Sequence, residues 1–449
     1  MARAQTVIEA PSPDAWERFE RYARRIESGS IWHYGSPPIS LDNRSSLETI
    51  VSADWDSVVS HYPGAQLLPH MTELMCSLEQ DAKYIRLFVT PILHTLELLH
   101  FRGPGISAAQ AALQVPSVNA PEAIRHLTVA LNPGEPGIFD KPDYIKVVSL
   151  LVRSMRNLVT LQVDSLDAAA IRHLASLPGL EKLDFAIGSS SRGVLTQPTP
   201  LAVPALRTAK LGVDWTEFPN LTLFLKRLVA PALVDLVLEY HVPEFSRSPT
   251  VQRPSTDHLD DLFTTLTRFR TLESFRIAQK GEKHHSFWYV AYADSTILSR
   301  LYVLEKLKTL DLCLVPCQIE ASDLEDIATA WPSMVNLRLG DKASADSCGI
   351  IVEDLLPFAL HCPHLQALGL MIDSPPPEVP RRFAQMRSRS ALEELYVGDH
   401  HVELSPEDVA VLVTLFPRIS GGDDWVDRTM QAMLRLLERE RELLSLEGL

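Results

Sequence analysis

Apolar residues recur along the chain in a short pattern, Leu-x-x-Leu-x-Leu, in which x is mostly polar. The pattern first fills its three apolar positions with Met71, Leu74 and Cys76. Later copies begin at Leu93, Ile124, Leu158, Leu180, Leu206, Leu233, Leu272, Leu307, Met334, Leu365 and Leu392. A decayed copy starts near Ile419, so twelve intervals cover 71 to 419 and the mean period is about 29 residues. The alternation of apolar and polar positions predicts one β-strand in each copy.

The period and the strand motif together are typical of leucine-rich repeats, which run at about 20–29 residues. We therefore predict an α/β leucine-rich-repeat solenoid, a curved horseshoe with parallel strands on its concave face and helices on its convex face. A chain of 449 residues exceeds what one closed core holds, whereas in a solenoid each repeat contacts only its neighbours. Helices are expected between the strands, over 144–155, 168–176, 219–228, 258–269, 321–330, 352–361 and 406–415.

Both ends of the array are predicted to carry helical caps, because a terminal repeat otherwise exposes its core. Residues 1–61 form the expected N-terminal cap region, with one helix over 12–27 and a second over 46–61. Ser12 and Pro13 suit the start of the first helix. The solenoid is expected over 62–424, and a C-terminal capping helix over 425–449.

Composition narrows the partners that such a chain would have. The formal net charge is −15, which argues against nucleic acid or an anionic membrane as the main partner, since both favour a basic surface. The chain has five cysteines, and this odd, scattered set suggests reduced thiols. No signal peptide and no membrane span is expected. These features predict a protein of the cytoplasm or nucleus.

The motifs of common catalytic sites do not stand out in the chain. A phosphate-binding Gly-rich loop, a dinucleotide fingerprint and a Gly-x-Ser-x-Gly elbow are not found in the sequence. The pair His400 and His401 with Glu403 is the nearest acid/base cluster, and a hydrolase using the 398–403 loop is a remote alternative. Cys313 and Cys317 lack a second pair at zinc-ligand spacing. We therefore expect no enzyme, with no catalytic residue, cofactor or metal.

The polar positions of the motif carry the main functional hypothesis, because alternate side chains of a strand lie on opposite faces. The residue between the last two apolar positions varies in charge and size, and it would line the concave face as a binding surface for a protein partner or substrate. The candidates are Gln162, Asp184, Lys210, Arg276, Asp311, Arg338 and Tyr396. The alternative is that these are solvated residues with no role. Their basic members could bind an acidic or phosphorylated partner segment, or neutralise acidic neighbours across the sheet.

Parts of the chain resemble the leucine-rich-repeat region of F-box-type proteins from basidiomycete fungi. The resemblance rests on the run Trp-Glu-Arg-Phe at 16–19 with Tyr-Ala-Arg-Arg at 22–25, on the segment 67–74, and on the divergent repeats up to about Gly421. It implies a substrate receptor that presents proteins to a cullin ubiquitin ligase, with a Skp-type adaptor as a further partner. An F-box helix set is not evident before Ser12, so a stand-alone repeat scaffold is the alternative.

Overall fold

The protein divides into two compact units in a computed structural model. The structure describes residues 13–25, 28–32, 48–51, 68–77, 88, 90–99, 122–130, 142–188, 191, 193, 199–214, 217–241, 255–279, 292–340, 349–373, 390–397, 406–419 and 421–422. The first unit comprises Met1–Gly212 with Arg227–Ala230, and the second comprises Val213–Lys226 with Pro231–Leu449. Each unit contains parallel strands and helices.

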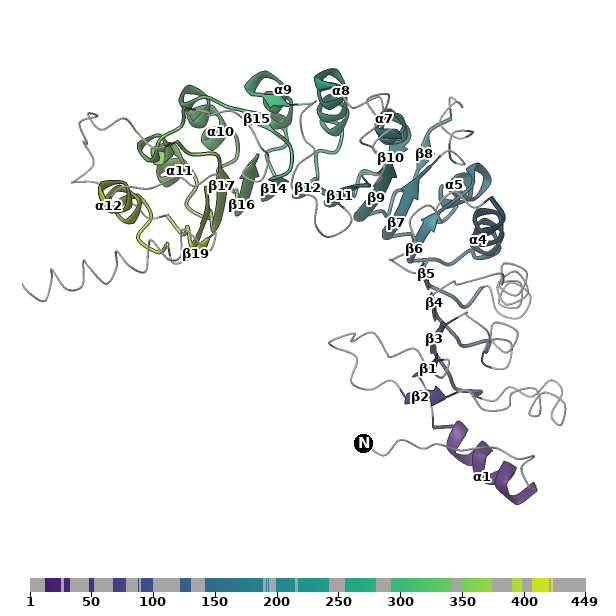
Figure 1. Ribbon diagram of the computed structural model, residues 1–449. Coiled ribbons are helices and arrows are strands. Elements are labelled where there is room, and N and C mark those ends of the chain that lie inside the picture. The colour runs from purple at the N-terminus through teal and green to yellow at the C-terminus, as the bar shows by residue number, and fades with distance from the viewer. Residues whose placement is uncertain are drawn as a thin grey trace, which may run out of the picture. The chain divides into compact units, whose positions relative to one another are not determined.

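The first unit contains parallel strands that follow one another in chain order, except that β2 lies outside β1 (Figure 1). In sheet order they are β2 Glu48–Val51, β1 Ser28–Trp32, β3 Glu73–Ser77, β4 Thr95–Leu99, β5 His126–Ala130, β6 Thr160–Ser165, β7 Lys182–Ile187 and β9 Thr208–Asp214. A separate short pair joins β8 Leu201–Ala202 to β10 Leu228–Val229. The helices are α1 Pro13–Ala23, α4 Pro142–Ser154 and α5 Ala168–Leu174. Helices α4 and α5 lie on one side of their strands.

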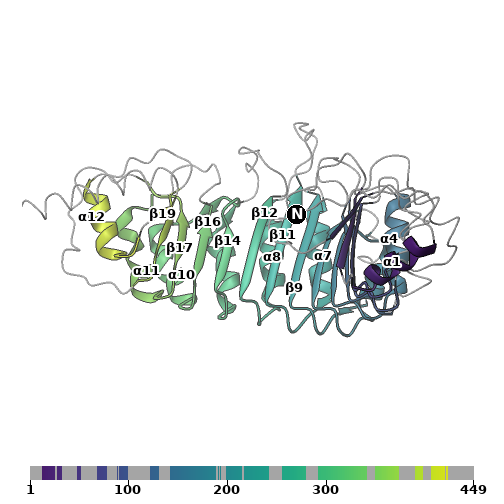
Figure 2. The same ribbon diagram turned by 90° about the horizontal axis from the view of Figure 1, so that it is seen from below.

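The second unit repeats the same arrangement with more helices, and its neighbouring strands lie side by side in Figure 2. In sheet order the strands are β11 Asp235–His241, β12 Ser274–Gln279, β14 Thr309–Leu312, β16 Asn336–Leu339, β17 Ala367–Leu370, β18 Glu394–Tyr396 and β19 Gly421–Gly422. A short pair joins β13 Ala293–Asp294 to β15 Cys317–Gln318. The helices are α7 Phe218–Arg227, α8 Thr256–Leu266, α9 Ser295–Ser299, η5 Arg300–Val303, η6 Ala321–Asp323, α10 Leu324–Ala330, η7 Val352–Leu355, α11 Leu356–His361 and α12 Pro406–Leu415. Parallel strands in chain order with helices on one side make each unit an α/β arrangement of solenoid type.

The apolar positions of the sequence motif form the core of both units. The middle positions pair in register along the first unit as Leu74, Leu96, Leu127, Leu161 and Leu183, each at most 2% exposed. In the second unit they pair as Leu236, Phe275, Leu310, Leu337, Leu368 and Leu395, each at most 1% exposed. Full burial of such a side chain stabilises the fold by roughly 1.5–3 kcal/mol. The repeated motif is thus the repeated unit of packing.

A turn of one kind precedes several of the strands. At most sites where the sequence reads x-Pro-x-Leu or x-Pro-x-Met, the last residue donates its N–H to the carbonyl of the first, as Met334 does to Trp331 at 3.0 Å and Met71 to Leu68 at 3.1 Å. Proline suits the second position of such a turn because its φ is already fixed near the required value. The turn therefore sets the point at which each strand begins.

Hydrogen bonds at the strand starts then fix the register. The carbonyl of Glu273 accepts from both Lys308 N at 2.7 Å and Thr309 N at 2.9 Å. The same paired bonds recur at the equivalent carbonyls of Val234, Lys308, Val335 and Gln366. Because every repeat makes the same contact, like positions of successive motifs lie side by side.

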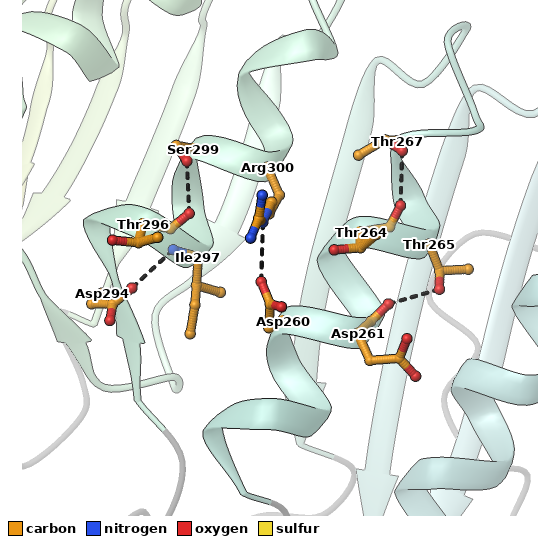
Figure 3. A network of polar contacts seen from close by, with 10 residues as sticks. All are labelled: Asp260, Asp261, Thr264, Thr265, Thr267, Asp294, Thr296, Ile297, Ser299 and Arg300. Carbon is orange, nitrogen blue, oxygen red and sulfur yellow. Dashed lines mark hydrogen bonds and ion pairs between the residues drawn. The ribbon is translucent and has the colours of Figure 1, made fainter.

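The helix layer of the second unit is joined by polar contacts between consecutive repeats (Figure 3). Arg300, at the start of η5, pairs with Asp260 of α8 at 3.1 Å. The carboxylate of Asp294 caps α9 by accepting from Ile297 N at 2.8 Å. Exposed ion pairs contribute little, roughly 0–1 kcal/mol each. The buried leucines, rather than these contacts, supply most of the stability.

The structure confirms the predicted α/β class, the parallel strands and the predicted helices at α1, α4, α5, α7, α8 and α10 to α12. It differs near the N-terminus. We expected a helix over 46–61, but residues 48–51 form β2, and β1 and β2 are parallel strands that extend the sheet beyond β3. The expected helix is therefore wrong at 48–51, because pairing with an open sheet edge overrides a short apolar helical pattern. Residues 52–67 and 423–449, which carry the expected cap boundaries, lie outside the described residues.

Candidate functional site

The side of each sheet opposite the helices carries the third and fifth residues of every strand motif; we call it the open face. In the second unit the fifth residues pair in register as one row, which reads Val237, Arg276, Asp311, Arg338, Gly369 and Tyr396. The third residues form a parallel row of Asp235, Ser274, Thr309, Asn336, Ala367 and Glu394. Strand pairing thus brings together side chains from repeats about 30 residues apart in the chain.

In the first unit, the basic candidate of the open face pairs with an acidic one. Gln162 is exposed and lies in register with Asp184 on the next strand. Lys210 Nζ lies 3.9 Å from Asp184 Oδ2, and both side chains are about one-third exposed (37% and 31%). The sequence left open whether the basic residues neutralise acidic neighbours across the sheet. In the first unit Lys210 neutralises Asp184 in this way.

In the second unit, Arg276 has no such pairing. Its side chain is exposed, and among the described residues it makes neither a hydrogen bond nor an ion pair. Asp311 lies directly beside it in register and accepts a hydrogen bond from the backbone N–H of Cys313 at 3.2 Å. Arg276 therefore presents a solvated positive charge on the open face.

Arg338 instead stacks on an aromatic ring two strands away. Its guanidinium carbon lies 4.1 Å from the centre of the Tyr396 ring. Gly369 stands between them in register on β17, and its lack of a side chain leaves room for Arg338 to cross that strand. The Tyr396 hydroxyl donates to Glu394 Oε2 at 2.8 Å. Cation–π contacts of this kind contribute about 0.5–1 kcal/mol at exposed sites.

The row of third residues holds a feature that the sequence did not reveal. In the described part of the chain, Ser274 Oγ, Asp235 Oδ1 and Asn336 Oδ1 are buried without a hydrogen-bond partner. An unsatisfied buried polar atom costs about 1–3 kcal/mol. The sequence signal was a run of small polar residues at one motif position, but their burial depends on neighbouring strands.

Two histidine rings meet near the starts of β4 and β5 in the first unit. The rings of His94 and His126 meet edge to face with their centres 6.5 Å apart. Burial lowers the pKa of His126, and the nearby charges of His94, Arg125 and Lys182 lower it further, against an opposing effect of Glu73. The imidazole of His126 is therefore held toward its neutral form. His126 is the third residue of its motif and is not among the candidates that the sequence predicted.

The other residues considered for chemistry lie in the core or outside the described residues. Cys313 and Cys317 are buried, and the Cys317 thiol donates to the Val315 carbonyl at 3.2 Å. Burial raises the pKa of the Cys362 thiol to about 12, so it stays protonated at neutral pH. Residues 398–405, with the His400–Glu403 loop, are not among those described. Within the described ranges, no three His, Cys, Asp or Glu side chains gather as metal ligands would.

Two further findings concern the chain as a whole. Of the helices that the structure describes, none has both the length and the apolar character needed to cross a membrane. No protein-family model and no curated protein matches the sequence.

Proposed function

We propose that the chain is a leucine-rich-repeat protein whose open face binds a protein partner and catalyses no reaction. The support is the difference between the two kinds of motif position. The apolar positions are mostly Leu, and those that the structure describes are buried, whereas the positions of the open face differ in charge and size, as Gln162, Asp184, Lys210, Arg276 and Tyr396 do. Packing requires the residues at the apolar positions to be alike. It does not restrict the residues of the open face, which are therefore free to vary for partner recognition.

The extent of the open face supports a macromolecular partner. In the second unit the fifth residues span six neighbouring strands, from Val237 to Tyr396. At about 4.8 Å per strand, such a row extends over about 24 Å. That length suits a protein interface of ordinary size better than a small molecule, which binds in a concave pocket.

The proposal is tested by photo-crosslinking from defined positions of the full chain. A photoreactive amino acid is placed at Gln162 or Arg276 on the open face, and at Leu223 or Leu360 on helices as a matched control. Leu223 and Leu360 are 41% and 54% exposed, so all four positions reach solvent. We expect a discrete crosslinked protein from the open-face positions. Equal crosslinking from the helix positions, or crosslinking from the helix positions alone, would contradict the proposal.

The resemblance to F-box-type proteins adds a more specific proposal, a substrate receptor of a ubiquitin ligase acting in the cytoplasm or nucleus. Its support is the Trp-Glu-Arg-Phe segment at 16–19, which falls in α1, together with the repeats. Co-purification of a Skp-type adaptor with the full chain tests it. If the open face captures a partner and the adaptor is absent, a stand-alone scaffold is the better description.

A further inference from the structure

We propose that Arg125, His126, Thr160 and Lys182, which we call the basic cluster, bind a phosphorylated serine or threonine side chain of the protein partner. The inference rests on the proposed function and names the chemistry of the partner. It is carried by the register of three strands in the first unit, by the charges that surround His126, and by the solvated state of the basic side chains.

The register of the sheet brings the basic cluster together. His126, Thr160 and Lys182 are the third residues of their motifs, and they pair in register on the consecutive strands β5, β6 and β7. Neighbouring strands are about 4.8 Å apart, so the Cα atoms of His126 and Lys182 are about 10 Å apart with Thr160 midway. Threonine is shorter than either neighbour, so an imidazole and an ammonium group flank its hydroxyl. Groups from three strands can therefore converge on one ligand.

The charges around His126 make this part of the open face positive. Burial lowers the pKa of His126, and the charges of His94, Arg125 and Lys182 lower it further, against the opposing charge of Glu73. The basic neighbours therefore outweigh the acidic one at the imidazole, although the chain as a whole carries a net charge of −15. An anion bound there would be attracted by this field and would favour the protonated imidazole.

The basic side chains of the cluster are available to a ligand. Arg125 and Lys182 are both exposed, and among the described residues neither side chain forms a hydrogen bond or an ion pair. Lys210, on the same face, instead lies 3.9 Å from the Asp184 carboxylate. The imidazole of His126 keeps one N–H donor even when it is neutral. The basic cluster therefore offers donors that no acidic side chain of the described chain occupies.

A phosphate group fits these donors better than a carboxylate does. It carries a charge of about −1.5 to −2 at neutral pH and three acceptor oxygens, whereas a carboxylate carries a single charge and two oxygens. The imidazole, hydroxyl and ammonium groups can each donate to a different phosphate oxygen. Arg125, which directly precedes His126, adds a further cation that favours phosphate.

Nucleic acid is the competing phosphate ligand, and the borders of the cluster argue against it. Binding to nucleic acid favours a basic surface that spans several phosphates. Here Glu73 lies two strands from His126 in the same row, and Asp184 follows Lys182 by two residues on β7. These carboxylates keep the positive surface short, as one phosphorylated side chain requires.

The test titrates the full chain, with its histidines carrying ¹³C, and follows the His126 ring signal by NMR. The probes are three short Gly- and Ala-flanked peptides that differ only in their central residue, which is phosphoserine, serine or glutamate. We expect the phosphoserine peptide to bind about tenfold more tightly than the serine peptide and about threefold more tightly than the glutamate peptide. Saturation with the phosphoserine peptide should also raise the pKa of His126, because the anion stabilises the imidazolium.

Three results would overturn the inference. The first is equal binding of the phosphoserine and serine peptides, or no binding of any peptide. The second is inorganic phosphate that binds as tightly as the phosphoserine peptide, which would indicate a site for a free anion. The third is a short oligothymidylate that binds more tightly than the peptide, which would indicate a nucleic acid ligand.

Variants of the basic cluster locate the contact. Arg125→Gln and Lys182→Gln should each weaken the phosphoserine peptide about fivefold. Lys182→Gln should also raise the pKa of His126 in the free chain, since it removes a positive neighbour. The matched control is Arg153→Gln, an exposed basic residue of α4, which should change the affinity by less than about twofold. Unchanged affinity in both cluster variants, or an equal loss in the control, would contradict the proposed site.

The photo-crosslinking experiment separates this inference from the proposed function. Gln162 lies two residues after Thr160 on β6, so a crosslinker there is next to the basic cluster. If it captures a partner in equal yield before and after the partner is treated with a phosphatase, the open face binds proteins and the phosphate inference is wrong. If crosslinks form only from the helix positions, the proposed function fails, and the peptide titration decides the phosphate site by itself.

Discussion

The two units place basic residues at the same motif position and use them differently. In the first unit Lys210 neutralises Asp184 on the neighbouring strand. In the second unit Arg338 lies beside Asp311 in register but stacks on Tyr396, two strands in the other direction. The sequence pattern is equivalent in both units. The difference comes from Gly369, which lets a long side chain reach past its nearest neighbour.

This comparison shows that charge order along a repeat array does not determine which charges pair. A Lys or Arg side chain on an open sheet can contact any of several partners within reach. Each such contact stabilises the fold by about 1 kcal/mol or less. A small residue on the intervening strand is enough to change the choice. The four predictions below test the contrast between the units, beginning with the largest expected effect.

The stability of both units should depend equally on the buried leucines at the middle position of the motif. Leu161→Ala on β6 and Leu310→Ala on β14 each remove a fully buried side chain, and each should lower the free energy of unfolding by about 2–5 kcal/mol through the cavity left behind. Urea unfolding measures the loss. A loss below about 1 kcal/mol in one unit would mean that its core is assembled differently.

Buried hydroxyl groups should distinguish the units. In the first unit, the Thr90 hydroxyl donates to the Met71 carbonyl at 2.8 Å, so Thr90→Val should destabilise the fold by about 1–2 kcal/mol. In the second, Ser274 Oγ has no partner among the described residues, so Ser274→Ala should be neutral or stabilise by up to about 1 kcal/mol. The same urea titration measures both. A marked loss with Ser274→Ala would show that the hydroxyl is satisfied in solution.

The two uses of a basic side chain should differ in their response to salt. A double-mutant cycle with Arg338→Met and Tyr396→Leu should give a coupling energy of about 0.5–1 kcal/mol. A cycle with Lys210→Met and Asp184→Asn should give about 0.2–0.5 kcal/mol, because that pair is partly solvated. When both cycles are repeated at high salt, the coupling energy of Lys210 with Asp184 should fall more than that of Arg338 with Tyr396. Equal coupling energies with equal salt dependence would remove the distinction.

The smallest effect should be a pH dependence confined to the first unit. The pKa of His126 is lowered in the folded state by burial and by the positive neighbours. The unfolded chain therefore binds the proton more readily, so this contribution to stability is present above the unfolded pKa of about 6.5 and is lost as the pH falls below it. His126→Gln should make unfolding less sensitive to acidification from about pH 7.5 to about pH 5.5. An unchanged pH profile would show that the His94–His126 contact does not form in solution.

The sequence alone predicted most of the regular structure. Strong periodicity placed each described strand from β3 to β18 that carries the motif, and it placed α12 at Pro406–Leu415. It also predicted which residues lie side by side, because aligned leucines force Arg276, Asp311 and Arg338 into one row. The prediction failed for elements with a weak or short apolar pattern. Helix α9 has five residues, too few for a periodic pattern. Strand β2 was predicted as helix because its Ile50 and Val51 belong to a longer run of apolar residues at helical spacing.

The sequence determined the repeat, the core and the order of charges on the open face, because each follows from one residue type recurring at one spacing. Only the tertiary structure decided which charges meet. Lys210 forms an ion pair with Asp184, and Arg338 stacks on Tyr396 across Gly369. The Ser274 hydroxyl has no hydrogen-bond partner among the described residues. These outcomes depend on the size of side chains about 30 residues away in the chain, which become neighbours only after the strands have paired.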